Sequence, residues 1–153
     1  MRYTLLILVI ALFASCDSDI KEIKVKDYTV ENEAEIKQYI EDNDLVAEKS
    51  ASGLYYMIEE AGTGEQPTAS SNVTVAYKGY FTNNSVFDES DADGISFPLN
   101  GVIAGWTEGI PYFKEGGKGK LLIPSHLAYG PYGNSRIPGG AVLIFDINLI
   151  KIN

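Results

Sequence analysis

Residues that commonly carry covalent chemistry are scarce in this chain. Its 153 residues include one cysteine, Cys16, one histidine, His126, and one tryptophan, Trp106. A single cysteine excludes an intrachain disulfide, so cysteine usage does not report the redox compartment. No serine or cysteine nucleophile motif accompanies His126, which argues against histidine-assisted hydrolysis. We therefore interpret His126 as a structural or exposed turn residue.

Basic residues are also in short supply. The chain has 12 Lys and Arg against 21 Asp and Glu, and its net charge is −9. A partner with a phosphate backbone requires a surplus of Lys and Arg, so we expect no binding to nucleic acid. The length suits one domain with a short appendage, and the hydrophobic content of 45% is enough for a real core.

Long hydrophobic runs are missing as well. The apolar run LLILVIALFA at residues 5–14 is too short to cross a bilayer of about 30 Å, but it suits the core of a secretory signal. It follows Arg2 and leads into FASC, which resembles a bacterial lipobox except that Phe13 replaces the usual leucine. In a lipobox the cysteine is lipidated and becomes the first residue of the mature protein.

We therefore expect a lipoprotein signal peptide at residues 1–15 and a lipid anchor on Cys16. The alternative is an ordinary signal peptide that is cleaved after small residues. With the lipid anchor, the protein would be attached to a membrane of the bacterial cell envelope, and its domain would face the periplasm or the cell surface.

Residues 16–50 are predicted to form an acidic tether that contains one short helix. The helix is expected at 31–42, where apolar side chains recur on one face (Ala34, Ile36, Tyr39 and Ile40). Asn32 and Glu35 make a plausible capping pair for its start. The helix either docks on the domain or stands off it. Residues 48–53, EKSASG, are interpreted as a linker.

Residues 51–153 show the pattern of a β-rich domain. Strands are predicted at 54–60, 73–81, 95–99, 118–124 and 141–152. A short helix is expected around Trp106, and Pro111 should end it after about two turns. Several strands with one central helix and no βαβ alternation predict an α+β fold with an antiparallel sheet.

Two motifs suggest ion or phosphate binding, and neither is complete. In DESDADG, residues 88–94, the spacing of Glu89, Asp91, Asp93 and Gly94 resembles the start of a calcium loop. However, Glu89 stands where the first ligand should be Asp, and Asn100 occupies the position of the bidentate Glu. Residues 116–120, GGKGK, lack the Ser or Thr of a phosphate loop. We interpret the first segment as a solvated turn between strands and the second as a turn that opens a strand, and we expect neither a metal nor a cofactor.

Aromatic residues are plentiful and lie beside glycines and turns: Tyr77, Phe87, Phe97, Trp106, Tyr129 and Phe145. They could simply fill the core. The alternative is a concave pocket lined by aromatic rings, because about 100 residues of domain seldom need so many bulky rings in so many segments.

The motifs of residues 52–153 resemble those of FK506-binding-protein-type peptidyl-prolyl cis–trans isomerases. The resemblance rests on VAYKGYF, VFDES, ISFPLNGVIAGWTEGI, GGKGKLLIPSHLAYGPYG and IPGGAVLIFDINLI, in this order. It implies a twisted antiparallel sheet of five or six strands wrapped around a short α-helix. It also implies rotation of X–Pro bonds in polypeptides and binding of macrolides such as tacrolimus or rapamycin.

The resemblance also implies a role for each pocket residue. Trp106 would form the floor under the prolyl ring. The Ile103 N–H and the Tyr129 hydroxyl would donate hydrogen bonds to substrate carbonyls, and Asp88 would be a polar contact. The remaining pocket residues would be the walls Tyr77, Phe87, Phe97 and Phe145, the rim Val102 and Ile103, and the cover Ile137.

The last loop departs from the family pattern. Pro138-Gly139 stands where two prolines are common, and Arg136 stands where small or apolar residues are frequent. A non-catalytic chaperone or protein-binding module therefore remains an alternative, because fold does not determine function. A polysaccharide-binding lipoprotein is a further alternative, and it would need a flat aromatic platform. We expect a monomer, because the N-terminal extension is short.

Overall fold

The structure is a computed structural model that describes residues 24–153. The signal peptide predicted at 1–15 and the lipidated Cys16 lie outside the described residues. The regular elements are α1 (Thr29–Asp42), β1 (Glu48–Lys49), β2 (Tyr55–Glu60), β3 (Asn72–Tyr80), β4 (Val86–Glu89), β5 (Ile95–Pro98), α2 (Ala104–Gly109), β6 (Lys118–Ile123) and β7 (Leu143–Ile152). Between residues 24 and 153, no helix is long and apolar enough to cross a bilayer.

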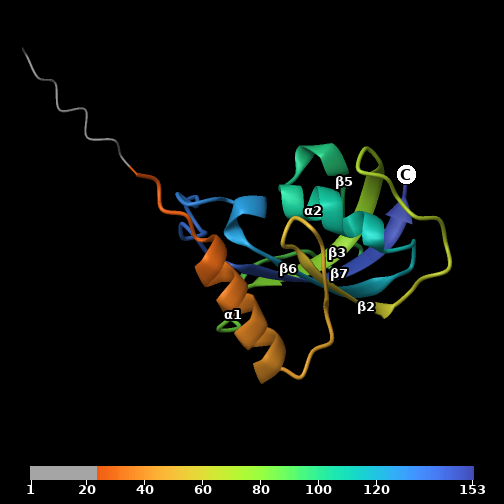
Figure 1. Ribbon diagram of the computed structural model, residues 1–153. Helices are drawn as coiled ribbons and strands as arrows, with labels where there is room; N and C mark the ends of the chain where they lie inside the picture. Colours follow the sequence, from red (N-terminus) through yellow and green to blue (C-terminus); the bar gives the residue numbers. More distant parts are fainter. Residues whose placement is uncertain (1–23) are drawn as a thin grey trace, which may run out of the picture.

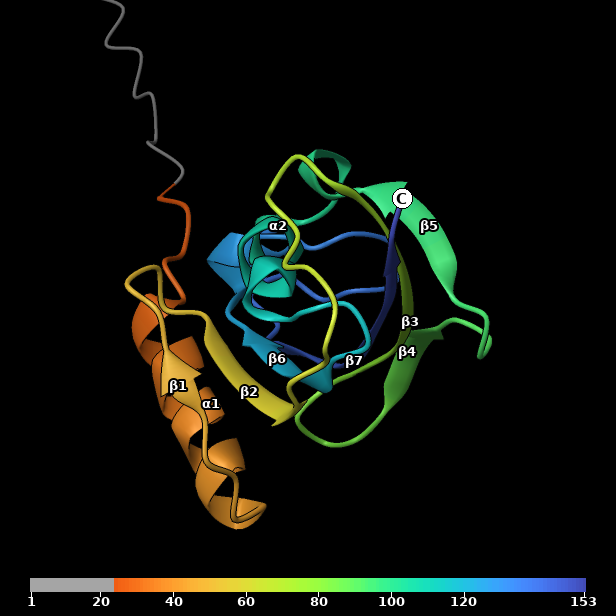
Figure 2. The ribbon, with the colours of Figure 1, turned by 90° about the vertical axis from the view of Figure 1, so that its right-hand side faces the viewer.

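The strands form one antiparallel sheet that curves around α2 (Figure 2). Their order is β1-β2-β6-β7-β3-β4, and β5 also pairs with β3. The predicted α+β class is confirmed. The described residues contain seven strands instead of five or six, because the expected linker at 48–53 begins with β1 and because β4 and β5 pair with different halves of β3.

Two glycines let α2 approach β6 closely. A Cβ atom at Gly105 would lie 2.5 Å from Ile123 Cγ2, and one at Gly109 would lie 2.7 Å from Leu121 Cδ2. The two glycines are four residues apart and therefore share one face of the helix. The helix ends at Gly109, and Pro111 lies in the following 3-10 turn, as predicted. This contact holds Trp106 inside the curve of the sheet.

The N-terminal helix α1 begins two residues earlier than predicted, at Thr29. Asp27 Oδ1 accepts the Thr29 N–H at 2.9 Å and the Thr29 hydroxyl at 2.6 Å. The predicted capping pair of Asn32 and Glu35 is wrong. Because the helix starts earlier, Asn32 lies within it and is buried against the domain, where its side chain bonds to other segments.

Helix α1 docks on the face of the sheet opposite to α2 (Figure 1). Ile36 and Tyr39 pack there with Leu122 and Ile144. The buried stripe runs through Asn32, Ile36 and Tyr39, whereas Ala34, which was predicted on the apolar face, is exposed. Strand β7 is therefore covered on both faces, which explains its almost continuous apolar sequence.

Candidate functional site: an aromatic pocket

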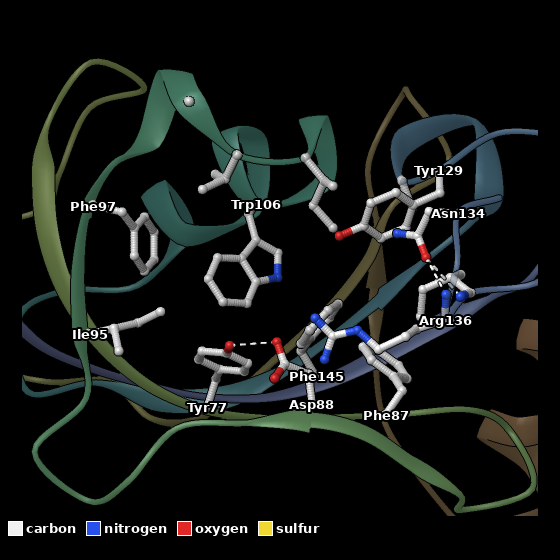
Figure 3. A pocket seen from close by; sticks show the side chains of 15 residues that line it. Tyr77, Phe87, Asp88, Ile95, Phe97, Trp106, Tyr129, Asn134, Arg136 and Phe145 are labelled. Atoms are coloured by element: carbon white, nitrogen blue, oxygen red, sulfur yellow. Dashed lines mark hydrogen bonds between the residues drawn. The ribbon is translucent and has the colours of Figure 1, made fainter.

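A cavity of about 560 Å³ opens on the concave face of the sheet, beside α2 (Figure 3). Every pocket residue predicted from the sequence lines it: Tyr77, Phe87, Asp88, Phe97, Val102, Ile103, Trp106, Tyr129, Ile137 and Phe145. The other lining residues are Ile95, Gly101, Ala128, Asn134 and Arg136. The structure therefore brings together segments that are up to 68 positions apart in the chain.

Trp106 forms the floor of the cavity and is only 6% exposed. Its ring centroid lies 5.0 Å from that of Tyr77 and 5.1 Å from that of Phe145, both in edge-to-face geometry. Phe97 lies 5.2 Å away at a tilted angle. These are favourable arrangements for aromatic pairs and they hold the rings rigidly around the open space.

Gly79 makes the packing of two wall residues possible. The rings of Phe87 and Phe145 meet edge to face at 5.5 Å. A Cβ atom at Gly79 would lie 2.7 Å from an atom of each ring, which is closer than real Cβ contacts. Strand β3 therefore carries a glycine here because the two rings occupy the space above its backbone.

Tyr77 and Asp88 supply a polar pair at the cavity. Tyr77 comes from β3 and Asp88 from β4, and the Tyr77 hydroxyl donates to Asp88 Oδ2 at 2.7 Å (Figure 3). Burial, followed by the hydrogen bond to the carboxylate, raises the pKa of Tyr77 to about 12. The phenol therefore stays neutral near pH 7 and continues to donate this bond.

The start of α2 places backbone polar groups at the cavity. The Ile103 carbonyl accepts the N–H groups of Trp106 at 2.9 Å and of Thr107 at 3.2 Å. The Thr107 hydroxyl donates to the Leu99 carbonyl at 2.5 Å, which ties the helix to the preceding 3-10 turn. The Ile103 N–H precedes the first intrahelical bonds, so the helix itself leaves this donor unpaired.

The loop between β6 and β7 supplies Tyr129 and Ile137. Asn134 shapes the loop, because its side-chain Oδ1 accepts the N–H groups of Arg136 and Ile137, each at 2.8 Å (Figure 3). Gly133 has φ +65°, a conformation that favours glycine. Sequence reasoning did not identify Asn134. Its only signal was an asparagine directly after a glycine in a turn, which is too common to indicate a site.

The weaker candidates from the sequence form strand ends and turns, and Asp88 is the residue of the 88–94 and 116–120 segments that lines the cavity. In the 88–94 segment, the Gly94 N–H bonds to Asp91 Oδ1 at 3.1 Å, as expected of a turn. Within residues 24–153, no group of three His, Cys, Asp or Glu side chains could hold a metal ion. His126 Nε2 lies 2.9 Å from the Ser52 carbonyl oxygen, which is a structural contact.

The lining of the cavity defines what it can do. It combines aromatic and aliphatic walls with a few polar groups, and the described residues contribute no serine, cysteine, histidine or lysine to it. Trp106 Nε1 is buried and has no hydrogen-bond partner among the residues that the structure describes. Such a lining suits non-covalent binding of an apolar ring whose flanking polar groups are hydrogen-bonded at the rim.

This fold and pocket define a class of protein in which a curved antiparallel sheet and a short helix enclose an aromatic cavity. The family model of the FKBP-type peptidyl-prolyl cis-trans isomerases matches residues 63–150. Because this match covers more than half of the chain, the protein belongs to that family.

Named relatives and solved structures agree with this assignment. The chain is 42% identical over 135 residues to the FKBP-type peptidyl-prolyl cis-trans isomerase FkpA of Escherichia coli K12, covering 86% of this chain and 50% of the relative. The crystal structure of FkpA from Escherichia coli matches with a TM-score of 0.73 at 43% identity, covering 82% of this chain and 61% of that one.

A shorter solved structure matches along almost its whole length. It is a peptidyl-prolyl cis-trans isomerase from Pseudomonas syringae, with a TM-score of 0.71 at 30% identity, and the match covers 84% of this chain and 97% of that one. The present chain spans about half the length of the FkpA relatives that it matches.

Proposed function

We propose that this protein is a peptidyl-prolyl cis–trans isomerase that accelerates rotation about X–Pro bonds in exported polypeptides. The observation that carries the proposal is the cavity itself, with a buried tryptophan floor, rings on its walls and hydrogen-bonding groups around it. The family membership agrees with it.

The reaction needs no nucleophile, because no covalent bond is broken. Amide resonance gives the X–Pro bond a rotational barrier of about 18–20 kcal/mol. The twisted transition state has lost this resonance, so its carbonyl oxygen carries less negative charge than in the planar state. Water stabilises the polar planar amide better than the twisted one. A dry aromatic cavity removes that advantage, and only interactions that are stronger in the twisted state accelerate the step.

Each lining residue that was predicted from the sequence has a specific part in the proposal. Trp106 supports the prolyl ring from below, and the walls are Tyr77, Phe87, Phe97 and Phe145. Val102 and Ile103 form the rim and Ile137 covers the ring. The Ile103 N–H and the Tyr129 hydroxyl, whose residue is 41% exposed, donate to substrate carbonyls. Asp88 orients the Tyr77 hydroxyl and does not act as a base.

The proposal includes the partners of the protein and its location in the cell. The partners are proline-containing polypeptides and, as inhibitors, macrolides such as tacrolimus or rapamycin. A lipidated Cys16 after the signal peptide 1–15 would attach the protein to a membrane of the cell envelope, with the domain in the periplasm or at the cell surface. We propose a monomer in which residues 51–153 form the isomerase domain and 16–50 the tether with α1.

A non-catalytic binding module is the second candidate. Arg136 lines the cavity, and Pro138-Gly139 changes the same loop, so the altered loop could favour recognition over turnover. A polysaccharide platform is disfavoured, because the floor tryptophan is buried inside a concave cavity instead of lying on a flat exposed surface.

The test is the exchange rate of a short Leu-Pro or Phe-Pro peptide, measured by NMR with residues 17–153. We expect accelerated exchange that rapamycin blocks. A folded protein that binds rapamycin without accelerating exchange would support the binding module and overturn the isomerase proposal.

A variant pair tests the part assigned to Asp88. Asp88→Asn should keep substantial activity, and Asp93→Asn, which changes an exposed carboxylate in the β4–β5 turn, is the matched control. Near-total loss in Asp88→Asn alone, with the fold intact, would contradict the orienting role and indicate a direct one.

A further inference from the structure

Asn32 is a buried polar residue on α1, outside the cavity. It is 1% exposed, and both polar atoms of its side chain are used. Its Nδ2 donates to the Gly140 carbonyl at 2.8 Å, and its Oδ1 accepts the Ser125 N–H at 2.8 Å. Ser125 and Gly140 are 93 and 108 positions away in the chain. They lie near the two ends of the loop that joins β6 to β7.

These contacts close a ring of hydrogen bonds through the loop. The Ser125 carbonyl accepts the Gly130 N–H at 2.8 Å, and the Gly130 carbonyl accepts the Gly140 N–H at 2.9 Å. Asn32 then links Gly140 back to Ser125. Tyr129 lies in the first span of the ring, and Ile137 lies in the second.

A second contact from the N-terminal extension reaches the same loop. Gly140 has φ +77°, and a Cβ atom there would overlap the ring of Tyr28. Tyr28 directly precedes α1, so the ring packs on the loop beside the Asn32 bond. The N-terminal extension therefore holds the Gly140 end of the loop by one hydrogen bond and by one ring.

We propose that Asn32 is a positioning residue for the pocket, acting through the ring of hydrogen bonds to hold Tyr129 and Ile137 over the cavity. This inference rests on the proposed function, since it gives the loop a task in binding the prolyl segment. A loop that is already ordered before binding loses less conformational entropy when substrate enters. The N-terminal helix thus belongs to the binding machinery, although none of its residues lines the cavity.

The structure also explains why an asparagine is used here. Its side chain has a donor and an acceptor on one short arm, so one residue can bond an N–H at one end of the loop and a carbonyl at the other. Leucine of similar size would leave both loop groups without these partners. Aspartate would keep the acceptor for Ser125 but would set a carboxylate oxygen against the Gly140 carbonyl.

The test uses the full chain with Asn32→Leu and Asn32→Asp. In Asn32→Leu, we expect amide hydrogen exchange to accelerate about tenfold or more at Ser125, Gly130 and Gly140, and to stay unchanged in the central strands β3 and β7. In Asn32→Asp, exchange should accelerate at Gly140 and change little at Ser125 and at Gly130, whose N–H bonds to the Ser125 carbonyl. This asymmetry distinguishes the two halves of the ring.

Binding and turnover are measured on the same variants. Catalytic efficiency of Asn32→Leu should fall by about three- to tenfold, mainly through a higher KM, and rapamycin should dissociate more readily. Asn43→Leu is the matched control. It changes the same residue type just past the other end of α1, where Asn43 Nδ2 donates to the Tyr39 carbonyl at 2.8 Å, far from the loop. It should leave loop exchange and activity unchanged.

The results separate this inference from the proposed function. Unchanged loop exchange in both Asn32 variants, or acceleration spread evenly through the central strands, would overturn the positioning role. If the wild-type protein does not isomerise peptides, the proposed function fails, and the exchange pattern and rapamycin affinity still decide whether Asn32 positions the loop. If Asn32→Leu does not fold, Asn32→Asp provides the test.

Discussion

Each face of the sheet carries a tyrosine hydroxyl that donates to an aspartate, and the two pairs lie in different surroundings. Tyr77 and Tyr80 lie three residues apart on β3, an odd spacing that directs them to opposite faces. The Tyr77 hydroxyl donates to Asp88 at 2.7 Å beside the cavity, and the Tyr80 hydroxyl donates to Asp146 at 2.9 Å under α1. Within residues 24–153, a cation lies within bonding distance of the second pair alone, because Lys120 contacts Asp146 and Tyr80.

The packing around the two pairs also differs between the faces. The concave face arranges rings around an open cavity and leaves Trp106 Nε1 without a partner in the described part of the chain. The opposite face closes Ile36 and Tyr39 over Leu122 and Ile144. An unpaired buried donor lowers stability by about 1–3 kcal/mol, which suits a binding site and not a core. The comparison indicates that the concave face leaves an open cavity beside its core, whereas the opposite face is closed by α1.

The largest difference between the faces should come from removing one large side chain on each. Trp106→Ala should abolish most isomerase activity, because the prolyl ring loses its floor. Leu122→Ala, at a fully buried position under α1, should lower the free energy of unfolding by about 2–5 kcal/mol while the folded protein stays active. Urea unfolding and peptide exchange by NMR measure both effects. Equal loss of activity per folded molecule would contradict the division between the faces.

The next largest effect should come from filling the space over Gly79. Gly79→Ala sets a Cβ atom against Phe87 and Phe145, so the two rings must move. We expect a loss of about 1–3 kcal/mol in stability together with weaker rapamycin binding, measured by calorimetry. Lys78→Ala is the control, because it changes the neighbouring exposed position of β3, which does not line the cavity. Rapamycin affinity that is unchanged in Gly79→Ala would show that the rings are not held by this glycine.

Removing each tyrosine hydroxyl should have a smaller effect, which falls mainly on stability for Tyr80 and mainly on turnover for Tyr77. Tyr80→Phe should lower the free energy of unfolding by about 1–2 kcal/mol and leave turnover unchanged, because its buried hydrogen bond is structural. Tyr77→Phe should change stability less and slow turnover a few-fold, because Asp88 loses its partner. Thermal unfolding and peptide exchange distinguish the two. A reversed pattern would assign the functional pair to the face under α1.

The smallest effect concerns pH. Hydrogen bonds from Lys49 and then Lys37 lower the pKa of Glu33 on α1 to about 2. Because the folded pKa lies below the unfolded value near 4.5, this stabilisation is present above pH 4.5 and is lost as pH falls towards 2. Glu33→Gln should therefore lose less stability than the wild type over this window, as followed by urea unfolding at each pH. Identical pH profiles for the two proteins would show that the ion pairs contribute nothing.

Local patterns in the sequence predicted most of the sheet. The alternation of Val73, Val75 and Tyr77 with polar or small residues identified β3, and Pro111 located the end of α2. The short strand β1 could not be predicted, because two polar residues in a linker carry no period, and they become a strand only when β2 lies beside them. The start of α1 was missed for a related reason, since Asn32 resembles a cap in sequence but bonds across the fold.

The sequence by itself determined the class of the fold and the identity of the pocket residues that the family motifs carry. Both depend on local patterns, because strand periods, helix stops and aromatic motifs are formed by residues that are close together in the chain. Only the tertiary structure decided how those rings meet over Gly79, that Asn134 shapes the loop, and that α1 is tied to it through Asn32. These contacts join residues that are many positions apart, and no local period records such pairs. They arise when the curvature of the sheet and the docking of α1 bring distant backbone groups within hydrogen-bond distance.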